Sequence, residues 1–420
     1  MSDPECRSAF TLGLGVLRTG RLVVAGVTTA SACWGKVAMS VVAAGADTIS
    51  PSVISRSRSA WQDPAESDRR SADVTILVPA HNEADRLPAT LTGLFAQTVR
   101  ARRVIVVADN CTDATEDIAA AAGAEVIETV GNREMKAGAL NQVLAGLLPA
   151  ARPDAYVLVV DADTVIAPHF IESAIECLAD PAVGAVGGVF VGEQGSGLLG
   201  LLQRSEYARY ARAVGRKKGV AMVLTGTSTM FRVAALQRVV AERGRRLPGR
   251  RGSVYNSDSL TEDSEMTVAL RSLGLRTRSP RACLVTTEVM PTPSTLWRQR
   301  VRWYRGALDN IRIYGVRRST APYIAQQVGL AAAVLAGALY LAVLAAAVVL
   351  GGFRITAFWS AIGGLFVLER LITARRAGPL AMLVGFVLVI EMAYDLFLQA
   401  AFIRSVVAIW RRQSATWDAA

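Results

Sequence analysis

Residues 155–163 read AYVLVVDAD, a run of six apolar residues that ends directly in an aspartate pair. A continuous, valine-rich run of this length is typical of a strand buried on both faces of a parallel sheet. Asp161 and Asp163 would lie at its carboxyl end, where open α/β sheets bind their ligands. Their carboxylates suit Mg²⁺ or Mn²⁺ bridging to a diphosphate, because such ions keep coordination positions for phosphate oxygens. For this pair taken alone, a solvated loop is the alternative.

Strand-like and helix-like segments alternate from residue 74 onward, a pattern that predicts an α/β fold with a mostly parallel sheet and helices on both faces. No internal repeat interrupts this alternation. The expected strands are 74–80, 102–109, 125–129, 155–160, 183–190 and 220–226, and the expected helices include one through Leu87, Leu91 and Leu94 and one over 136–148.

The early strands each end in polar residues, which a parallel sheet would bring to one edge. Polar strand ends are common in any protein, because strands are joined by solvated loops. Three such clusters in register favour a shared binding crevice instead. The first two clusters comprise Pro79, His81, Asn82 and Glu83 after the first strand and Asp109, Asn110, Cys111, Thr112 and Asp113 after the second.

Lys136 opens the segment KAGALN, at the expected N-terminus of a helix. A lysine there can place its charge beside a phosphate that also meets free backbone N–H groups, and Gly138 would let the backbone come close. A lysine exposed to solvent is the alternative.

The segment TED at 261–263 precedes another helical stretch. Thr261 and the acids could cap that helix. Alternatively, one acid could act as a general base that removes a proton from an acceptor hydroxyl.

The segment QRVRW carries Gln299, Arg302 and Trp303 just before the first long apolar segment. Arg302 could neutralise a leaving diphosphate, and Trp303 offers a flat face to a sugar ring or to the membrane interface. A basic amphipathic helix lying on a membrane is the alternative, and it is compatible with both roles.

The chain is apolar for a soluble enzyme, with 52% hydrophobic residues and a mean hydropathy of +0.32. Residues 324–350 carry no charge and are long enough to cross a bilayer. A second segment at 355–368 is short for a span, and a third at 380–403 contains Glu391 and Asp395. Acids within a span usually face other helices or a polar cavity. We therefore expect two or three membrane helices.

The net charge of +11 could suggest nucleic acid, but the basic residues gather at 298–318 and 375–376, beside the apolar segments. That placement matches the positive charge found on the cytoplasmic side of membrane proteins, and it predicts no nucleic-acid partner. We expect a multi-pass protein of the cell membrane with residues 74–310 in the cytoplasm. The scattered cysteines and two histidines indicate a reduced compartment without structural zinc.

These patterns predict an ordered domain arrangement. An apolar N-terminal segment, interfacial or membrane-inserted, is followed by a polar linker, an α/β domain, an interfacial basic helix, the membrane helices and a short tail. The expected bounds are 1–50, 51–73, 74–295, 296–320, 321–405 and 406–420 in that order.

In its motifs and in their order along the sequence, the chain resembles the membrane-embedded, family 2 inverting glycosyltransferases with a GT-A fold. These enzymes include cellulose, chitin, hyaluronan and poly-N-acetylglucosamine synthases. The resemblance covers roughly residues 74–310. The matching strings are LVPAHNEA at 77–84, DNCTD at 109–113, KAGALN at 136–141, DAD at 161–163, GTSTMFR at 226–232, TED at 261–263 and QRVRW at 299–303.

The resemblance implies a role for each matching residue. Asp109, with Pro79 and Glu83, would hold the uridine of a UDP-sugar, and Lys136 would touch the diphosphate. Asp161 would contact the nucleotide and share the Mg²⁺ or Mn²⁺ ion with its neighbour. The remaining implied roles are metal ligand for Asp163, catalytic base for Asp263, and acceptor or diphosphate contact for Glu262, Gln299, Arg302 and Trp303.

The implied reaction is a single in-line displacement that forms a β-glycosidic bond. The donor would be UDP-N-acetylglucosamine or a related UDP-hexose, and the acceptor a growing glycan or a lipid-linked hydroxyl. Processive synthesis and a single transfer both stay open. The alternatives are a polyprenyl-phosphate sugar transferase and a non-catalytic nucleotide-binding regulator.

Overall fold

The structure is a computed structural model that describes residues 70–352, 356–375 and 378–413. The predicted N-terminal segment at 1–50, most of the predicted linker and residues 414–420 of the predicted tail lie outside the described residues. Strand β1 begins at Arg70, so residues 70–73, expected in the linker, belong to the sheet.

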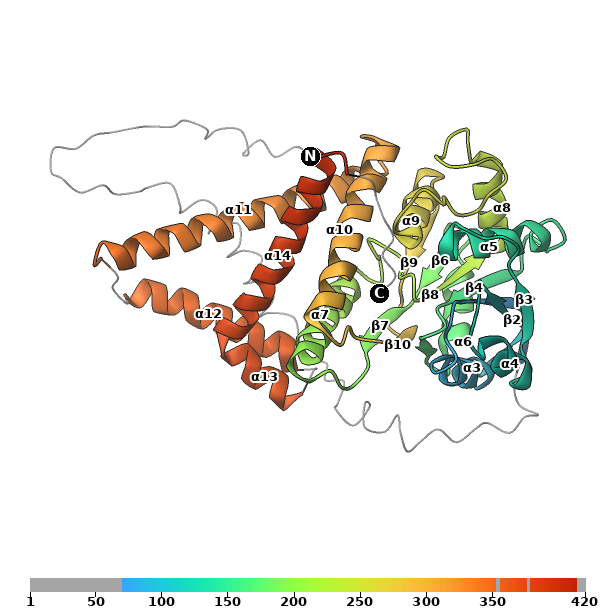
Figure 1. Cartoon of the computed structure of the whole chain (residues 1–420), viewed down its shortest axis with the longest axis horizontal. Coiled ribbons are helices and arrows are strands. Elements are labelled where there is room, and N and C mark those ends of the chain that lie inside the picture. The colour runs from blue at the N-terminus through green and yellow to red at the C-terminus, as the bar shows by residue number, and fades with distance from the viewer. Residues whose placement is uncertain (1–69, 353–355, 376–377, 414–420) are drawn as a thin grey trace, which may run out of the picture. The chain divides into compact units, whose positions relative to one another are not determined.

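The central sheet has seven strands in the order β3-β2-β1-β4-β8-β6-β9 (Figure 1). Six strands run in one direction, and β8 alone is antiparallel to its neighbours β4 and β6. This confirms the mostly parallel α/β sheet predicted from the sequence. The strands are β1 (Arg70–Ala80), β2 (Val99–Ala108), β3 (Glu125–Glu128), β4 (Tyr156–Val160), β6 (Val183–Gly187), β8 (Ser228–Arg232) and β9 (Arg276–Arg278).

Strand β4 is buried on both faces, as its unbroken apolar run predicted. Val157 and Val159 join one hydrophobic cluster, while Leu158 and Val160 join another on the opposite face of the sheet. The first cluster takes in α5 (Met135–Leu147), α8 (Val233–Glu242) and α9 (Glu262–Ser272). The second takes in α3 (Leu87–Phe95), α4 (Thr115–Ala121) and α6 (Phe170–Leu178). Helices therefore cover both faces, and the carboxyl edge stays open for a site.

The strand expected at 183–190 is divided between two sheets. It forms β6 and then β7 (Val189–Gly192), which belongs to a small sheet with β5 (Val165–Ile166) and β10 (Leu284–Thr287). The division falls at Gly188, where a Cβ would lie 2.7 Å from the side chain of Val285. Only glycine permits this close approach to β10.

The prediction of a strand at 220–226 is wrong, because this apolar stretch is a loop. The strand β8 begins just after it, at Ser228. The backbone of the loop is bonded to side chains instead of a neighbouring strand. Leu224 N donates to Thr267 Oγ1 at 2.9 Å, and Gly226 N donates to Asp263 Oδ2 at 2.9 Å. Burial explains the apolar composition, since Ala221 and Leu224 are almost fully enclosed.

The C-terminal part is helical, and two of its described helices are long and apolar enough to cross a membrane: Ala321–Val349 and Val389–Trp410. The apolar segment expected as a span at 380–403 is broken at Val387, whose ψ of 75° is not helical. The second candidate span therefore runs beyond the predicted limit at residue 405. The helices are α10 (Pro293–Tyr314), α11 (Ala321–Val349), α12 (Ala357–Ala374), α13 (Pro379–Phe386) and α14 (Leu388–Trp410), and α7 (Gly197–Arg216) packs against them.

The acids within α14 face other helices, as expected for acids in an apolar segment. Glu391 is 2% exposed and accepts from Arg209 of α7 at 3.2 Å and from Arg370 of α12 at 3.1 Å. Asp395 pairs with the same Arg370 at 2.7 Å. These ion pairs join α14 and α12 to α7.

Candidate active site

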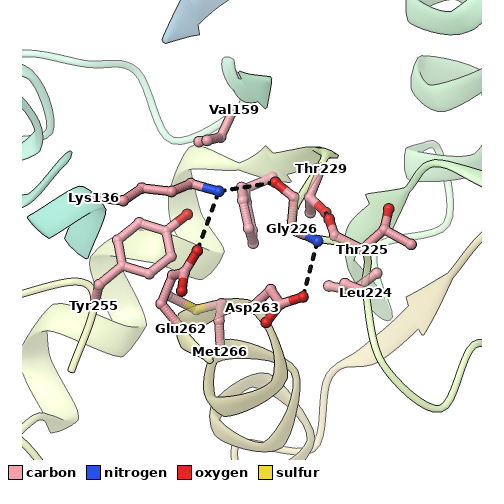
Figure 2. A pocket seen from close by; sticks show the side chains of 11 residues that line it. Lys136, Val159, Leu224, Thr225, Gly226, Thr229, Tyr255, Glu262, Asp263 and Met266 are labelled. Carbon is pink, nitrogen blue, oxygen red and sulfur yellow. Dashed lines mark hydrogen bonds and ion pairs between the residues drawn. The ribbon is translucent and has the colours of Figure 1, made fainter. Parts of the chain in front are cut away.

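Lys136 joins three segments of the chain at the carboxyl edge of the sheet. It is the second residue of α5, which begins at Met135. Its Nζ lies 2.5 Å from Asp161 Oδ1 at the end of β4 and 3.1 Å from Glu262 Oε1 in the first turn of α9. It also donates to the carbonyl oxygen of Gly226 at 3.0 Å (Figure 2). An ammonium group has three N–H donors, so these acceptors match its capacity.

The lysine gives the two neighbouring acids of α9 different protonation behaviour. Burial disfavours charge on Glu262, but the charge and hydrogen bond of Lys136, together with a backbone hydrogen bond and the charge of Arg302, outweigh it and lower the pKa of Glu262. Burial, followed by the negative charge of Glu262, raises the pKa of Asp263 to about 6. Of the two, Asp263 is therefore the better proton acceptor near neutral pH.

The backbone holds the Asp263 carboxylate in one orientation. Its Oδ2 accepts from Gly226 N at 2.9 Å, and its Oδ1 accepts from Ser264 N at 2.7 Å. A Cβ on residue 226 would lie 3.2 Å from Asp263 Oδ2, so glycine is what lets this loop reach the carboxylate. The loop between α7 and β8 thus aligns the acid.

A small cavity lies beneath this group, lined by Lys136, Glu262, Asp263 and the ring of Tyr255 among others (Figure 2). Its volume of about 20 Å³ holds roughly one water molecule. Asn141 of α5 holds Tyr255 in place, because its Oδ1 accepts from Tyr255 N at 2.8 Å and its Nδ2 donates to Tyr255 O at 3.0 Å. Any ligand much larger than a water molecule must therefore bind outside this cavity.

Carboxyl groups crowd the neighbouring part of the edge. Burial, then the charges of Asp163 and Asp161, raise the pKa of Glu83 to about 7. Burial raises the pKa of Asp161 to about 6, and Asp163 adds to this effect although Lys136 opposes it. The pKa of Asp163 is raised too, mainly by burial. A cation would relieve this repulsion.

The aspartate pair fits a divalent ion that completes its shell with phosphate oxygens, since Mg²⁺ takes only one or two carboxylates in such sites. Asp163 Oδ1 accepts from Thr164 Oγ1 at 3.0 Å, which orients one carboxylate. Among residues 70–352, 356–375 and 378–413, no group of three or more His, Cys, Asp and Glu side chains could hold a metal by itself. A metal ion held by Asp161 and Asp163 would therefore need further ligands from a bound molecule.

Asp109 lies in the loop after β2 and is only 8% exposed. Its Oδ1 accepts three hydrogen bonds: from Thr129 Oγ1 at 2.7 Å, from Asn132 Nδ2 at 2.8 Å and from Asn110 Nδ2 at 3.0 Å. The same Asn132 amide donates to Met135 O at 2.9 Å, directly before Lys136. Asp109 is therefore rigidly tied to the start of α5.

The loops after β1 and β2 are bonded to each other beside Asp109. Asn82 Oδ1 accepts from Thr112 N at 2.7 Å, and Glu83 N donates to Thr115 Oγ1 at 2.8 Å. Asn82 has a φ of 56°, a conformation that asparagine tolerates better than most residues. Pro79, opposite Val107 in the strand register, leads into this loop pair. Two of the three predicted polar clusters therefore form one structure.

The QRVRW segment lies within α10, so the predicted helix is present. The charge of Arg302 contributes to the lowered pKa of Glu262, after burial and the larger effect of Lys136. Gln299 has a buried Oε1 with no hydrogen-bond partner in the described structure. Trp303 packs under the guanidinium of Arg300, whose Cζ lies 4.3 Å from the ring centroid. In the described part of the chain, no hydrogen bond or ion pair joins Gln299 or Trp303 to Lys136 or Asp263.

Comparison with known proteins agrees with this arrangement. The family described as Glycosyltransferase like family 2 matches residues 72–306, more than half of the chain. The chain belongs to this family of glycosyltransferases. The match contains all the predicted site residues, from Pro79 to Trp303.

Two curated relatives of this glycosyltransferase are poly-beta-1,6-N-acetyl-D-glucosamine synthases. The protein of Staphylococcus aureus strain MSSA476 is 27% identical over 242 residues, which are 56% of this chain and 54% of that protein. The protein of Staphylococcus epidermidis is 26% identical over 246 residues, with the same shares covered. The chain thus spans about half the length of the curated relatives it matches.

A solved mannosyltransferase from Pyrobaculum calidifontis, in complex with GDP-Man and Mn²⁺, has a similar fold. The TM-score is 0.54 at 20% identity, and the similarity covers 86% of this chain and 95% of that one. At this identity the likeness concerns the fold alone. The fold is the GT-A type expected from the sequence.

Several residues that shape the site of this glycosyltransferase escaped the sequence analysis. Gly306 of α10 lies against Thr261, since a Cβ there would be 2.4 Å from Thr261 Oγ1. One turn later, Asn310 Nδ2 donates to Thr261 Oγ1 at 3.2 Å. A glycine inside a helical segment is a packing signal that could have found this contact. It holds α10 against the beginning of α9.

A buried ion pair supports the same junction and had no sequence signal. Arg243 and Glu265 are paired through two bonds, Nη1 to Oε1 at 2.5 Å and Nη2 to Oε2 at 2.7 Å, and both side chains are fully buried. The hydroxyl of Tyr314, at the end of α10, donates to the same carboxylate. The pairing joins residues far apart in the chain, so only the fold reveals it.

Proposed function

We propose that this glycosyltransferase is a membrane-bound, inverting enzyme that transfers N-acetylglucosamine, or a related hexose, from a UDP-sugar to an acceptor hydroxyl in a β-linkage. The names of the staphylococcal relatives support this sugar. The observation that carries the proposal is the contact group of Lys136, Asp161 and Glu262 beside Asp263, which joins the strand end, the α5 start and the TED segment.

The donor would bind in the crevice above these residues. Asp109 would accept from the uracil ring, with Pro79 and Glu83 lining the same pocket. The three donors on one oxygen of Asp109 leave this carboxylate little freedom, which favours recognition of a planar base. Asp161 would lie at the nucleotide and Lys136 beside the diphosphate.

Asp163, with Asp161, would hold a Mg²⁺ or Mn²⁺ ion. When bound, that ion supplies positive charge to the diphosphate leaving group. Burial, with repulsion between neighbouring carboxylates, raises the pKa of Glu83 and of Asp163, and both effects support a cation at this place. The lysine and the ion would together offset charge on the departing UDP.

Asp263 would accept the proton of the acceptor hydroxyl as that oxygen attacks the anomeric carbon. Its carboxylate is held by two backbone N–H groups, and a pKa of about 6 leaves it mostly ionised at neutral pH. Since the attack and the departure of UDP occur on opposite faces of the sugar, an α-linked donor gives a β-linked product.

The acceptor would approach along α10. Gln299 and Trp303 would bind its terminal sugar, with Arg302 and Glu262 on the diphosphate side. The unpartnered Oε1 of Gln299 is a buried acceptor that a sugar hydroxyl would satisfy.

The helices α11 and α14 would anchor the enzyme in the cell membrane as a multi-pass protein, with the catalytic domain in the cytoplasm. No part of α11 in its most apolar window is buried by the protein, which suits contact with lipid. Arg317 and Arg318, exposed just before α11, support the cytoplasmic orientation.

Membranes that contain the protein, incubated with a panel of radiolabelled UDP-sugars, test the proposal. We expect label from UDP-N-acetylglucosamine in a product that a β-N-acetylglucosaminidase digests, and sizing of that product separates processive synthesis from single transfer. Label confined to an acid-labile lipid phosphate would favour a polyprenyl-phosphate transferase. Absence of transfer from every UDP-sugar would contradict the proposal.

A further inference from the structure

Arg300, the residue after Gln299 in the QRVRW segment, is the most deeply buried charge on α10. It is 1% exposed, and its Nη2 donates to Glu206 Oε2 of α7 at 2.9 Å. The hydroxyl of Tyr394 on α14 donates to the same carboxylate oxygen at 2.7 Å. The carboxylate of Glu206 therefore joins α7 to α10 and to the candidate membrane helix α14.

The guanidinium of Arg300 also covers one face of the Trp303 ring. Its Cζ lies 4.3 Å from the centroid of the Trp303 ring and 6.0 Å from that of Tyr207, which is close enough for cation–π attraction. Tyr207 is itself held edge-on against Phe190 of β7, with centroids 4.5 Å apart. Because Arg300 is fixed by Glu206, the face of Trp303 that it covers is fixed as well.

Helix α14 also packs along α10. Phe397 packs edge-on against Trp297 at 5.4 Å, and Phe402 against Tyr304 at 5.6 Å. Further along, Ser405 Oγ donates to the carbonyl oxygen of Val301 at 3.1 Å. In Figure 1 the red α14 accordingly runs beside α10. The two helices would move together rather than separately.

We propose that Tyr394 of α14 is a positioning residue for the acceptor side of the site, acting through Glu206 and Arg300 on the ring of Trp303. The inference rests on the proposed function, in which Trp303 binds the acceptor sugar. Tyr394 does not touch the substrate; its hydroxyl orients the carboxylate that holds Arg300. The candidate membrane helix α14 would thereby determine the position of the Trp303 ring on which the acceptor sugar stacks.

Tyr394→Phe tests this, because it removes only the hydroxyl and keeps the aromatic packing. In detergent-solubilised full-length protein we expect the KM for a β-1,6-linked N-acetylglucosamine oligomer to rise roughly three- to ten-fold, the scale of the net contribution of one hydrogen bond. The Kd for UDP should stay unchanged, whereas the thermal unfolding midpoint should fall slightly because a buried hydrogen bond is lost. Tyr340→Phe, at a half-exposed position of α11, is the matched control. It should leave the acceptor KM, the Kd for UDP and the unfolding midpoint unchanged.

A double-mutant cycle separates positioning from a general structural role. With Trp303→Leu already present, adding Tyr394→Phe should leave the remaining acceptor KM unchanged, since the ring that it positions is gone. An equal further loss in that background, or Tyr394→Phe behaving like Tyr340→Phe, would overturn the inference. Failure of the wild-type protein to use any UDP-sugar would instead refute the proposed function, so the two failures are distinguishable.

Discussion

Lys136 Nζ lies 2.5 Å from Asp161 Oδ1, so the start of α5 and the end of β4 are joined by an ion pair at the edge of the sheet. The pair brings together two motifs that are 25 residues apart in the chain. Through Glu262 the same lysine also sets the environment of Asp263.

Lys136→Met should destabilise the protein and weaken UDP binding. It would leave Asp161 and Glu262 without their counter-charge, a change that costs about 2 kcal/mol at a site where the lysine side chain is still 20% exposed. Thermal unfolding of the solubilised protein and titration with UDP measure both effects. Arg152→Met, which breaks a solvent-exposed pair with Asp154, is the control and should change neither. Equal stability of the two variants would contradict the account.

Transfer should depend on pH with a rising limb near pH 6. Asp263 must be ionised to accept a proton, and burial with the nearby Glu262 charge raises its pKa to about 6. Activity is therefore lost as the pH falls through that value and is retained above it. A profile of kcat/KM for the acceptor from pH 4.5 to pH 8, at saturating metal, measures the limb. A profile that is flat down to pH 4.5 would argue against Asp263 as the base.

Asp163→Ala should remove the metal dependence of donor binding. In the wild-type protein, Mg²⁺ or Mn²⁺ should tighten the binding of a UDP-sugar, and a chelator should reverse this, because an ion held by the carboxylates would supply positive charge to the diphosphate. In the variant, we expect the same weak Kd with metal and with chelator. Calorimetric titration under both conditions gives the answer, and a variant that still responds to metal would exclude Asp163 as a ligand.

Gly306→Ala should impair the junction of α10 with α9. The added Cβ would lie 2.4 Å from Thr261 Oγ1, so the helix would have to move away from the TED segment. We expect a lower unfolding midpoint and a loss of transfer of roughly tenfold or more, in line with overpacking costs of about 1–3 kcal/mol. Gly329→Ala is the control on α11, where nothing lies within 4 Å of the added methyl. It should be neutral or slightly stabilising.

The parts of the fold that local pattern could predict are those where composition follows burial directly. The apolar run before Asp161 is buried on both faces, and the loop clusters after β1 and β2 do meet. The same rule failed at 220–226, where an apolar stretch is buried as a loop whose N–H groups bond to Thr267 and Asp263. Residues more than thirty positions away decide that outcome, and no local pattern contains them.

Long-range contacts also explain what the sequence left out of the site. Gly306, Asn310 and the Arg243–Glu265 pair position α10 and α9 through neighbours that are distant in the chain. The break between α13 and α14 at Val387 likewise has no proline at that position that would have predicted it. Motif strings identified the residues that would meet the substrate, whereas the residues that hold those motifs in place became visible only in the fold.

In the proposed reaction Asp263 is the catalytic base of a sugar transferase, and the substitution Asp263→Asn tests this role. The substitution keeps the size of the side chain and an oxygen that the Gly226 amide can still reach, but it removes the proton acceptor. The account predicts that transfer from the UDP-sugar falls by at least about a hundredfold, the scale of general-base catalysis, while the Kd for UDP is unchanged. Turnover equal to that of the wild-type protein would contradict it.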